Sequence, residues 1–117
     1  MRDHSKLKAY QLADALVLEV YKATGEFPQE ERFGLASQMR RAAISIASNL
    51  VEGSARKSET EYARFIELSY GFFRELQYQI SLAARLGYLE SGALEPRATQ
   101  VAKTIGALLN ALRKPSR

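Results

Sequence analysis

Hydrophobic residues recur along most of the chain at steps of three and four, the spacing that places side chains on one face of an α-helix. In the first such stretch, Ala13, Val17 and Val20 share a face, whereas Asp14 and Glu19 fall away from it. Nowhere does the chain show the strict alternation of apolar and polar residues that is typical of strands. The pattern predicts four helices, over residues 7–24, 32–52, 59–86 and 94–113.

The connections between these helices are short and are marked by residues that interrupt or end helices. Gly25 and the Phe27-Pro28 step separate the first two helices, Gly53 is expected to cap the C-terminus of the second, and Gly87 follows the third. Short connections favour neighbouring helices that run in opposite directions. We therefore expect one all-α domain over residues 1–117, an antiparallel up-and-down four-helix bundle.

The second and third helices carry apolar residues over a wider arc than one bundle core requires, whereas the fourth has only a narrow apolar seam. Two explanations are open. These helices are the central pair of the bundle, or their additional apolar surface is buried against other copies of the chain. We favour self-association, because a monomer would expose a large apolar patch.

The residue types present exclude several classes of chemistry. The 117 residues include no cysteine, which excludes disulfides and thiolate metal sites, and the single histidine, His4, lies in a terminal segment. No Glu-x-x-His pair, glycine-rich phosphate loop or serine with a histidine partner in a structured region is present. We therefore expect a protein that is not an enzyme and has no cofactor or metal. No apolar run approaches the ~20 residues of a membrane span, so we expect a cytoplasmic protein with no membrane partner.

Positive charge is concentrated at three places in a chain of 17 basic and 13 acidic residues. Arg40 and Arg41 are adjacent in the second helix, and Arg56 and Lys57 occupy the loop that follows it. The segment after residue 96 contains no acidic residue and five basic ones, Arg97, Lys103, Arg113, Lys114 and Arg117. Repeated around an oligomer, these charges would bind a phosphate backbone without reading its sequence. Ordinary solvated surface charge is the alternative.

A stripe of polar residues also runs along the second helix, formed by Ser45, Ser48, Asn49 and Glu52. One interpretation is a ligand or nucleic-acid site. The other is a structural stripe, solvated or hydrogen-bonded between helices, in which Arg41 pairs with a carboxylate such as Glu52 or Glu75. We favour the structural interpretation, because charged helix faces are most often solvated.

Three motifs follow one another in the first half of the chain: F-P-x-x-E-x-x-G-L at residues 27–35, S-Q-x-R-R-A at 37–42 and S-I-x-S-N-x-x-E-G at 45–53. From about Tyr10 to Leu89 the sequence resembles the four-helix-bundle family named for proteins encoded in intervening sequences of bacterial 23S rRNA. This resemblance implies an up-and-down bundle that assembles as a homopentamer. A related branch comprises the accessory proteins of diversity-generating retroelements, whose positively charged pentamer binds nucleic acid and a reverse transcriptase.

These observations lead to two hypotheses about function. The first is a non-enzymatic oligomeric scaffold that binds RNA or another nucleic acid through Arg40, Arg41, Arg56 and Lys57. The second is a protein–protein interaction bundle with no nucleic-acid role, whose partner is another polypeptide and whose basic residues keep it soluble.

Overall fold

Four α-helices make up most of the computed structural model, which describes residues 2–90 and 92–113. They are α1 (Lys8–Thr24), α2 (Leu35–Ser54), α3 (Glu59–Arg85) and α4 (Glu95–Arg113). Single turns of 3-10 helix at His4–Lys6 and Gln29–Glu31 precede α1 and α2. The described part of the chain contains no strand, so the all-α prediction is confirmed. None of its helices combines the length and apolar character needed to cross a membrane.

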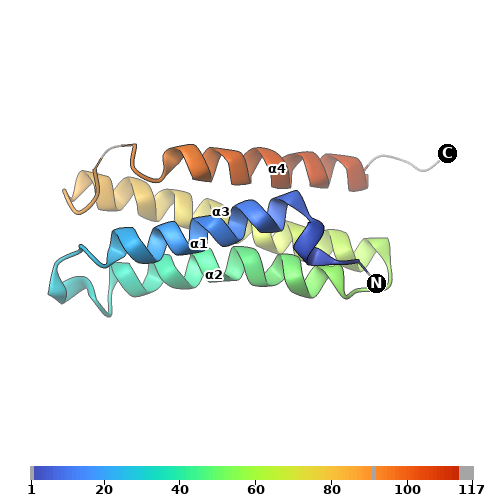
Figure 1. Ribbon diagram of the computed structural model, residues 1–117, viewed down its shortest axis with the longest axis horizontal. Helices are drawn as coiled ribbons and strands as arrows, with labels where there is room; N and C mark the ends of the chain where they lie inside the picture. Colours follow the sequence, from blue (N-terminus) through green and yellow to red (C-terminus); the bar gives the residue numbers. More distant parts are fainter. Residues whose placement is uncertain (1, 91, 114–117) are drawn as a thin grey trace.

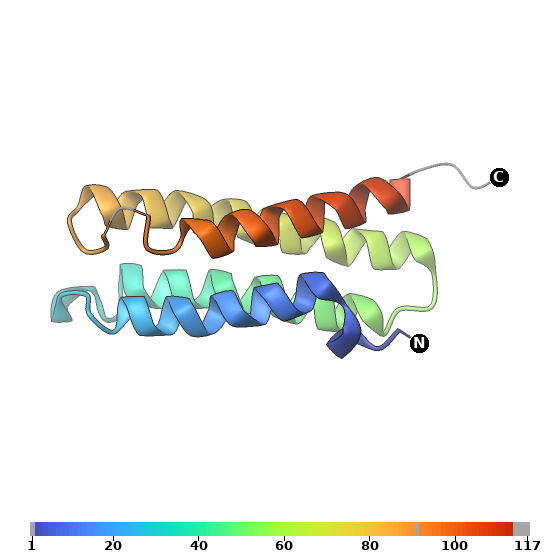
Figure 2. The ribbon, with the colours of Figure 1, turned by 45° about the horizontal axis from the view of Figure 1, so that its top comes forward.

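The helices lie side by side along the long axis of a molecule that measures 52 × 21 × 19 Å (Figure 1). From near the N-terminus the chain passes to the far end along α1 and returns along α2, and α3 and α4 repeat this path (Figures 1 and 2). Each helix packs against two others, since α1 and α3 both contact α2 and α4. The α1–α2 and α3–α4 connections therefore lie at the same end of the molecule.

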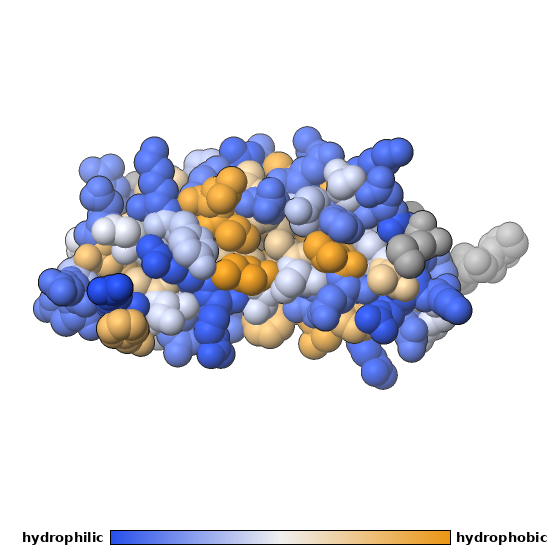
Figure 3. All heavy atoms as spheres, turned by 60° about the horizontal axis from the view of Figure 1, so that its bottom comes forward, coloured by the Kyte–Doolittle hydropathy of each residue, from blue (hydrophilic) through white to orange (hydrophobic). Residues whose placement is uncertain are grey.

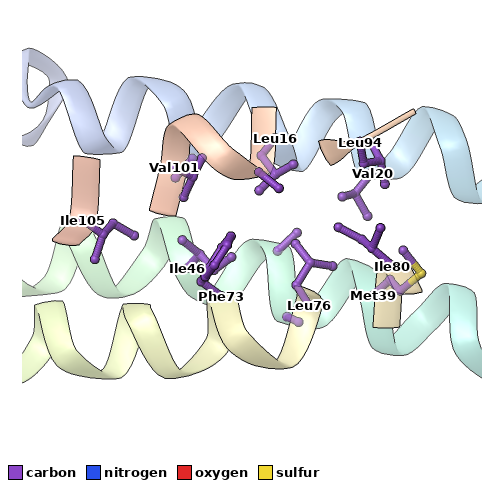
Figure 4. Close-up of a cluster of buried hydrophobic side chains, with 14 of the residues drawn as sticks. Leu16, Val20, Met39, Ile46, Phe73, Leu76, Ile80, Leu94, Val101 and Ile105 are labelled. Atoms are coloured by element: carbon purple, nitrogen blue, oxygen red, sulfur yellow. The ribbon is translucent and has the colours of Figure 1, made fainter. Parts of the chain in front are cut away.

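One apolar core runs between the four helices. Each helix contributes a fully buried side chain to it, for example Leu16, Met39, Leu76 and Ile105. Figure 4 shows these side chains pointing into the space between the helices, at different positions along the bundle. Because burial of apolar surface is the main favourable term in folding, this core holds the helices in fixed positions relative to one another.

Packing against two neighbours accounts for much of the broad apolar arc of α2. This helix forms its most extensive contact with α3, and there the buried Ser69 hydroxyl donates a hydrogen bond to the Ile46 carbonyl, 2.8 Å away. Some large apolar side chains nevertheless stay exposed. They are Leu18 and Tyr21 on α1, Phe33 directly before α2, Ile44 on α2, and Leu68, Tyr78 and Leu86, which lie on α3 or directly after it. Figure 3 shows hydrophobic side chains gathered along the middle of the face on which α2 comes forward.

The structure corrects the role expected for Gly53. Helix α2 continues to Ser54, so Gly53 lies within the helix and does not cap it. A Cβ atom placed on Gly53 would lie 2.8 Å from the Cβ atom of Phe65 on α3. Glycine at this position therefore permits the close approach of the two helices.

The start of α2 also differs from the expected position at residue 32. Residues 29–31 form the 3-10 turn, and the Glu31 carboxylate accepts a hydrogen bond from the Leu35 backbone N–H at 3.1 Å. That contact satisfies one of the free N–H groups at the start of α2, so the α-helix begins at Leu35.

Candidate nucleic-acid interface

The α1–α2 connection is held in place by contacts with the start of α2 and with the segment that follows α3. The ring of Phe27 is buried and lies 5.5 Å from the ring of Tyr88, which follows α3. One oxygen of Glu31 accepts the hydrogen bond from Leu35, and the other accepts one from the Tyr88 hydroxyl at 3.0 Å. This second bond raises the pKa of the Tyr88 hydroxyl. A Cβ atom on Gly34 would lie 2.7 Å from Glu31 Oε1, so a larger residue there would displace the oxygen that accepts the hydrogen bond from Leu35.

Arg40 links α2 to the end of α1. Its Nε donates a hydrogen bond to Thr24 Oγ1 at 2.8 Å, and one terminal nitrogen donates to the Tyr21 carbonyl at 3.2 Å. Its guanidinium also lies 4.5 Å from the centre of the Tyr21 ring. These contacts place a cation at a helix C-terminus, where the helix dipole favours positive charge. Arg40 is thus a structural residue whose charge is fixed in position.

Arg32 and Arg41 are exposed beside Arg40, and we call these three residues the arginine surface. A cavity of about 270 Å³ on it is lined by Tyr21, Arg32, Phe33, Ser37, Arg40, Arg41 and Ile44. A neighbouring cavity of about 320 Å³ shares Arg32 and Arg40. Neither cavity has an Asp or Glu side chain in its lining, whereas Glu67 and Glu75 line a hollow on α3 that also contains Arg64. In these two cavities the arginine surface therefore presents positive charge that no lining carboxylate neutralises.

The other two predicted contacts, Arg56 and Lys57, lie beyond the opposite end of α2, separated from Arg40 and Arg41 by about 20 Å of helix axis. The Arg56 guanidinium lies 4.9 Å from the centre of the Phe65 ring, and its Nε donates to the Glu52 carbonyl at 3.3 Å. Lys57 is exposed. Within one chain, the four predicted residues therefore form two separate pairs.

A third cation, Arg2, reaches the same end of the molecule as Arg56. It donates a hydrogen bond to the Arg56 carbonyl at 3.1 Å, forms an ion pair with Glu59 at 3.1 Å and lies 3.8 Å from the centre of the Tyr62 ring. Burial raises the pKa of Tyr62, and the charge of Arg2 opposes this shift. The charge of Arg2 is therefore paired with Glu59, whereas Arg56 and Lys57 at this end form no ion pair with any described residue.

The polar stripe of α2 is mostly surface. Ser48 and Glu52 are exposed, and the Asn49 side chain donates a hydrogen bond to the Ser45 carbonyl at 2.7 Å. Arg41 and Ser45 line a cavity together with Glu75, but among the described residues no carboxylate oxygen lies within 4.0 Å of the Arg41 side-chain nitrogens. The ion pair considered for Arg41 is therefore absent, and its guanidinium remains available.

Two arginines of α4 are paired with carboxylates on other helices. Arg97 pairs with Glu19 of α1 and Arg113 with Glu67 of α3, each at 2.8 Å. Lys103 is exposed, and Lys114 and Arg117 lie outside the described residues. Helix α4 therefore contributes less free positive charge than its acid-free sequence indicated.

Two residues of this region were not among the predicted contacts, Arg32 and Phe33. Both residues fell in the first turn of the helix expected over residues 32–52, and only the structure shows that they lie in a turn before α2. Across residues 2–90 and 92–113 no three His, Asp or Glu side chains come close enough together to hold a metal ion.

Comparison with known proteins identifies the family of this chain. No curated protein gives a significant match. The sequence model of a family described as 23S rRNA-intervening sequence protein matches residues 5–111, a longer span than the resemblance over residues 10–89 and one that includes most of α4. The chain therefore belongs to the family of 23S rRNA-intervening sequence proteins.

Proposed function

We propose that the protein is a non-enzymatic scaffold in which antiparallel up-and-down bundles assemble as a homopentamer and bind RNA or another nucleic acid through their basic surfaces. The observation that carries the nucleic-acid proposal is the arginine surface, where Arg32, Arg40 and Arg41 together line a cavity without a carboxylate. Guanidinium groups form paired hydrogen bonds with phosphate oxygens. Five copies in one assembly would repeat this surface and so raise the affinity for a long strand.

Salt dependence tests the nucleic-acid proposal. Each bound phosphate releases condensed counterions, so log Kobs for RNA should fall linearly with log salt concentration. Changing Arg32 and Arg41 together to glutamine should lower the slope by about 1 for each phosphate that the variant no longer binds, with the fold unchanged because both side chains are exposed. Fluorescence anisotropy with a labelled RNA, recorded over a series of salt concentrations, gives the slope.

A control variant that loses the same charge elsewhere on the surface shows whether the change in salt slope depends on the position of the lost charge. Lys8 and Lys103 are exposed and lie away from the arginine surface, so their double change to glutamine should alter the slope little. The pair Arg56→Gln and Lys57→Gln measures the contribution of the opposite end in the same way. Absence of RNA binding at low salt would contradict the proposal, as would equal effects of all three double variants.

Exposed apolar surface supports the homopentamer. A cavity of about 360 Å³ on α3 is lined by Leu68, Gly71 and Phe72 together with charged residues, and Leu68 is 46% exposed. Apart from the backbone of α3 itself and the two chain neighbours of Gly71, no described atom lies within 4 Å of the position that a Cβ on Gly71 would take, so the helix backbone is open to a partner there. An apolar side chain of a second copy, seated in this hollow, would remove Leu68 and Phe72 from water.

The mass in solution tests self-association. Sedimentation should give about 65 kDa, five times the 13.1 kDa of one chain. Leu68→Glu should shift the protein toward monomer, because it places a charge in the apolar contact. Gln77→Glu introduces the same charge at an exposed position of α3 and should leave the mass unchanged. A monodisperse monomer at micromolar concentration would contradict the proposal.

The competing function is a bundle that binds another polypeptide and no nucleic acid. The same α3 hollow favours it, because an apolar groove with charged edges suits an amphipathic helix. It predicts capture of a protein partner that depends weakly on salt and is abolished in Leu68→Glu.

A further inference from the structure

Phe33 is exposed to an unusual degree for a large apolar side chain. Its exposed fraction is 87%, and it lies in the turn between the Gln29–Glu31 3-10 helix and α2. The backbone on either side is fixed: the N–H groups of Arg32 and Gly34 donate hydrogen bonds to the carbonyls of Gln29 and Glu31 at 3.1 Å. The contacts of Glu31 with Leu35 and Tyr88 attach the same turn to the bundle. The ring is therefore presented to solvent by a turn whose backbone is hydrogen-bonded, and it adds almost no buried apolar area to the core.

The surroundings of the ring are positively charged. The Arg32 guanidinium lies 5.3 Å from the centre of the Phe33 ring, yet leaves the side chain 87% exposed. Phe33, Arg32 and Arg41 all line the cavity of about 270 Å³ that has no carboxylate in its lining. The carboxylate of Glu31, which is next in sequence to Arg32, bonds to Leu35 and Tyr88 instead.

Tyr78 offers a useful comparison. It is also an exposed aromatic side chain with an arginine near its ring, since it is 60% exposed and Arg85 lies 6.0 Å from its centre. It lines none of the cavities at the arginine surface. The combination of an exposed ring with a cavity that contains arginines and no carboxylate therefore distinguishes Phe33.

We infer that this surface binds an unpaired segment of nucleic acid, with a base stacked on Phe33 and the neighbouring phosphates bound by Arg32 and Arg41. The inference rests on the proposed function and narrows the proposed ligand from nucleic acid in general to single strands. Phosphate binding alone needs only the arginines, whereas an exposed ring adds affinity when a base has a free face. In a duplex the bases are stacked on one another, so Phe33 has no such partner there.

The test compares Phe33→Ala with Tyr78→Ala on two labelled probes, a single strand of about 20 uridines and an RNA duplex of similar length. Phe33→Ala should weaken binding of the single strand roughly tenfold without changing its salt slope, because it removes the stacking of a base and no charge. Binding of the duplex should stay within about twofold of the wild-type affinity, since duplex bases do not stack on the ring. Phe33→Tyr should restore single-strand affinity, and Tyr78→Ala should leave both affinities unchanged.

The outcomes separate this inference from the proposed function. Unchanged single-strand affinity in Phe33→Ala, or equal losses on both probes, would overturn the stacking inference. If Arg32→Gln with Arg41→Gln still lowered the salt slope, the proposed function would stand. Absence of binding to both probes at low salt would overturn both and would leave the arginine surface to a polypeptide partner.

Discussion

Leu76→Ala should lower the free energy of unfolding by about 3 kcal/mol, the typical cost of removing a large side chain from a closely packed core. Leu76 is fully buried on α3 and lies among core side chains of the other helices (Figure 4). Truncation loses the transfer free energy of the removed methylene and methyl groups and leaves a cavity, because packed helices relax only in part. Urea denaturation should show the midpoint lowered by about 1–3 M.

The matched control is Leu18→Ala, which removes the same atoms from a side chain that is 66% exposed on α1. Its loss of stability should stay below about 1 kcal/mol, because little apolar area returns to water. Both variants are measured at one protein concentration, with the mass confirmed to be that of the wild type, since association shifts apparent stability. Equal losses in the two variants would show that burial in this core does not decide stability.

The helices were predictable because their signals are local. Apolar residues at steps of three and four report which face of a helix is buried, and Gly87 adopts a φ of 80° after α3, as a glycine at a helix end often does. The start of α2 was less accessible. It depends on the conformation of the turn before α2, in which the Glu31 carboxylate bonds to the Leu35 N–H. The second partner of Glu31, Tyr88, is distant in sequence, so no local pattern indicates this contact.

The candidate site was predictable only in part, because its residues depend on contacts between distant segments. The adjacent residues Arg40 and Arg41 are both arginines of one helix, yet Arg40 binds the end of α1, whereas Arg41 forms no ion pair with any described residue. Pairing of Arg97 with Glu19 joins α4 to α1, and no local pattern reports it. A sequence therefore shows where charge is abundant, but the fold decides which charges remain unpaired.

Helices α2 and α3 approach each other closely at Gly53, so an added methyl group there should destabilise the bundle. Gly53→Ala should lower the free energy of unfolding by about 1–2 kcal/mol, although alanine favours helix formation by about 1 kcal/mol over glycine. The new methyl group would lie 2.8 Å from Phe65 Cβ, an atom fixed to the backbone of α3. A side-chain rotation cannot relieve this overlap, so the two helices must separate locally.

Gly106→Ala provides the comparison, because Gly106 lies within α4 and a Cβ there would have no described atom of another helix within 4 Å. There the helix-forming tendency of alanine acts alone, so stability should rise by up to about 1 kcal/mol. Thermal or urea unfolding of both variants should therefore give changes of opposite sign for one chemical substitution. A gain in stability for Gly53→Ala would mean that the space between α2 and α3 accommodates a methyl group at this position. The third motif, S-I-x-S-N-x-x-E-G, would then need another reason for its final glycine.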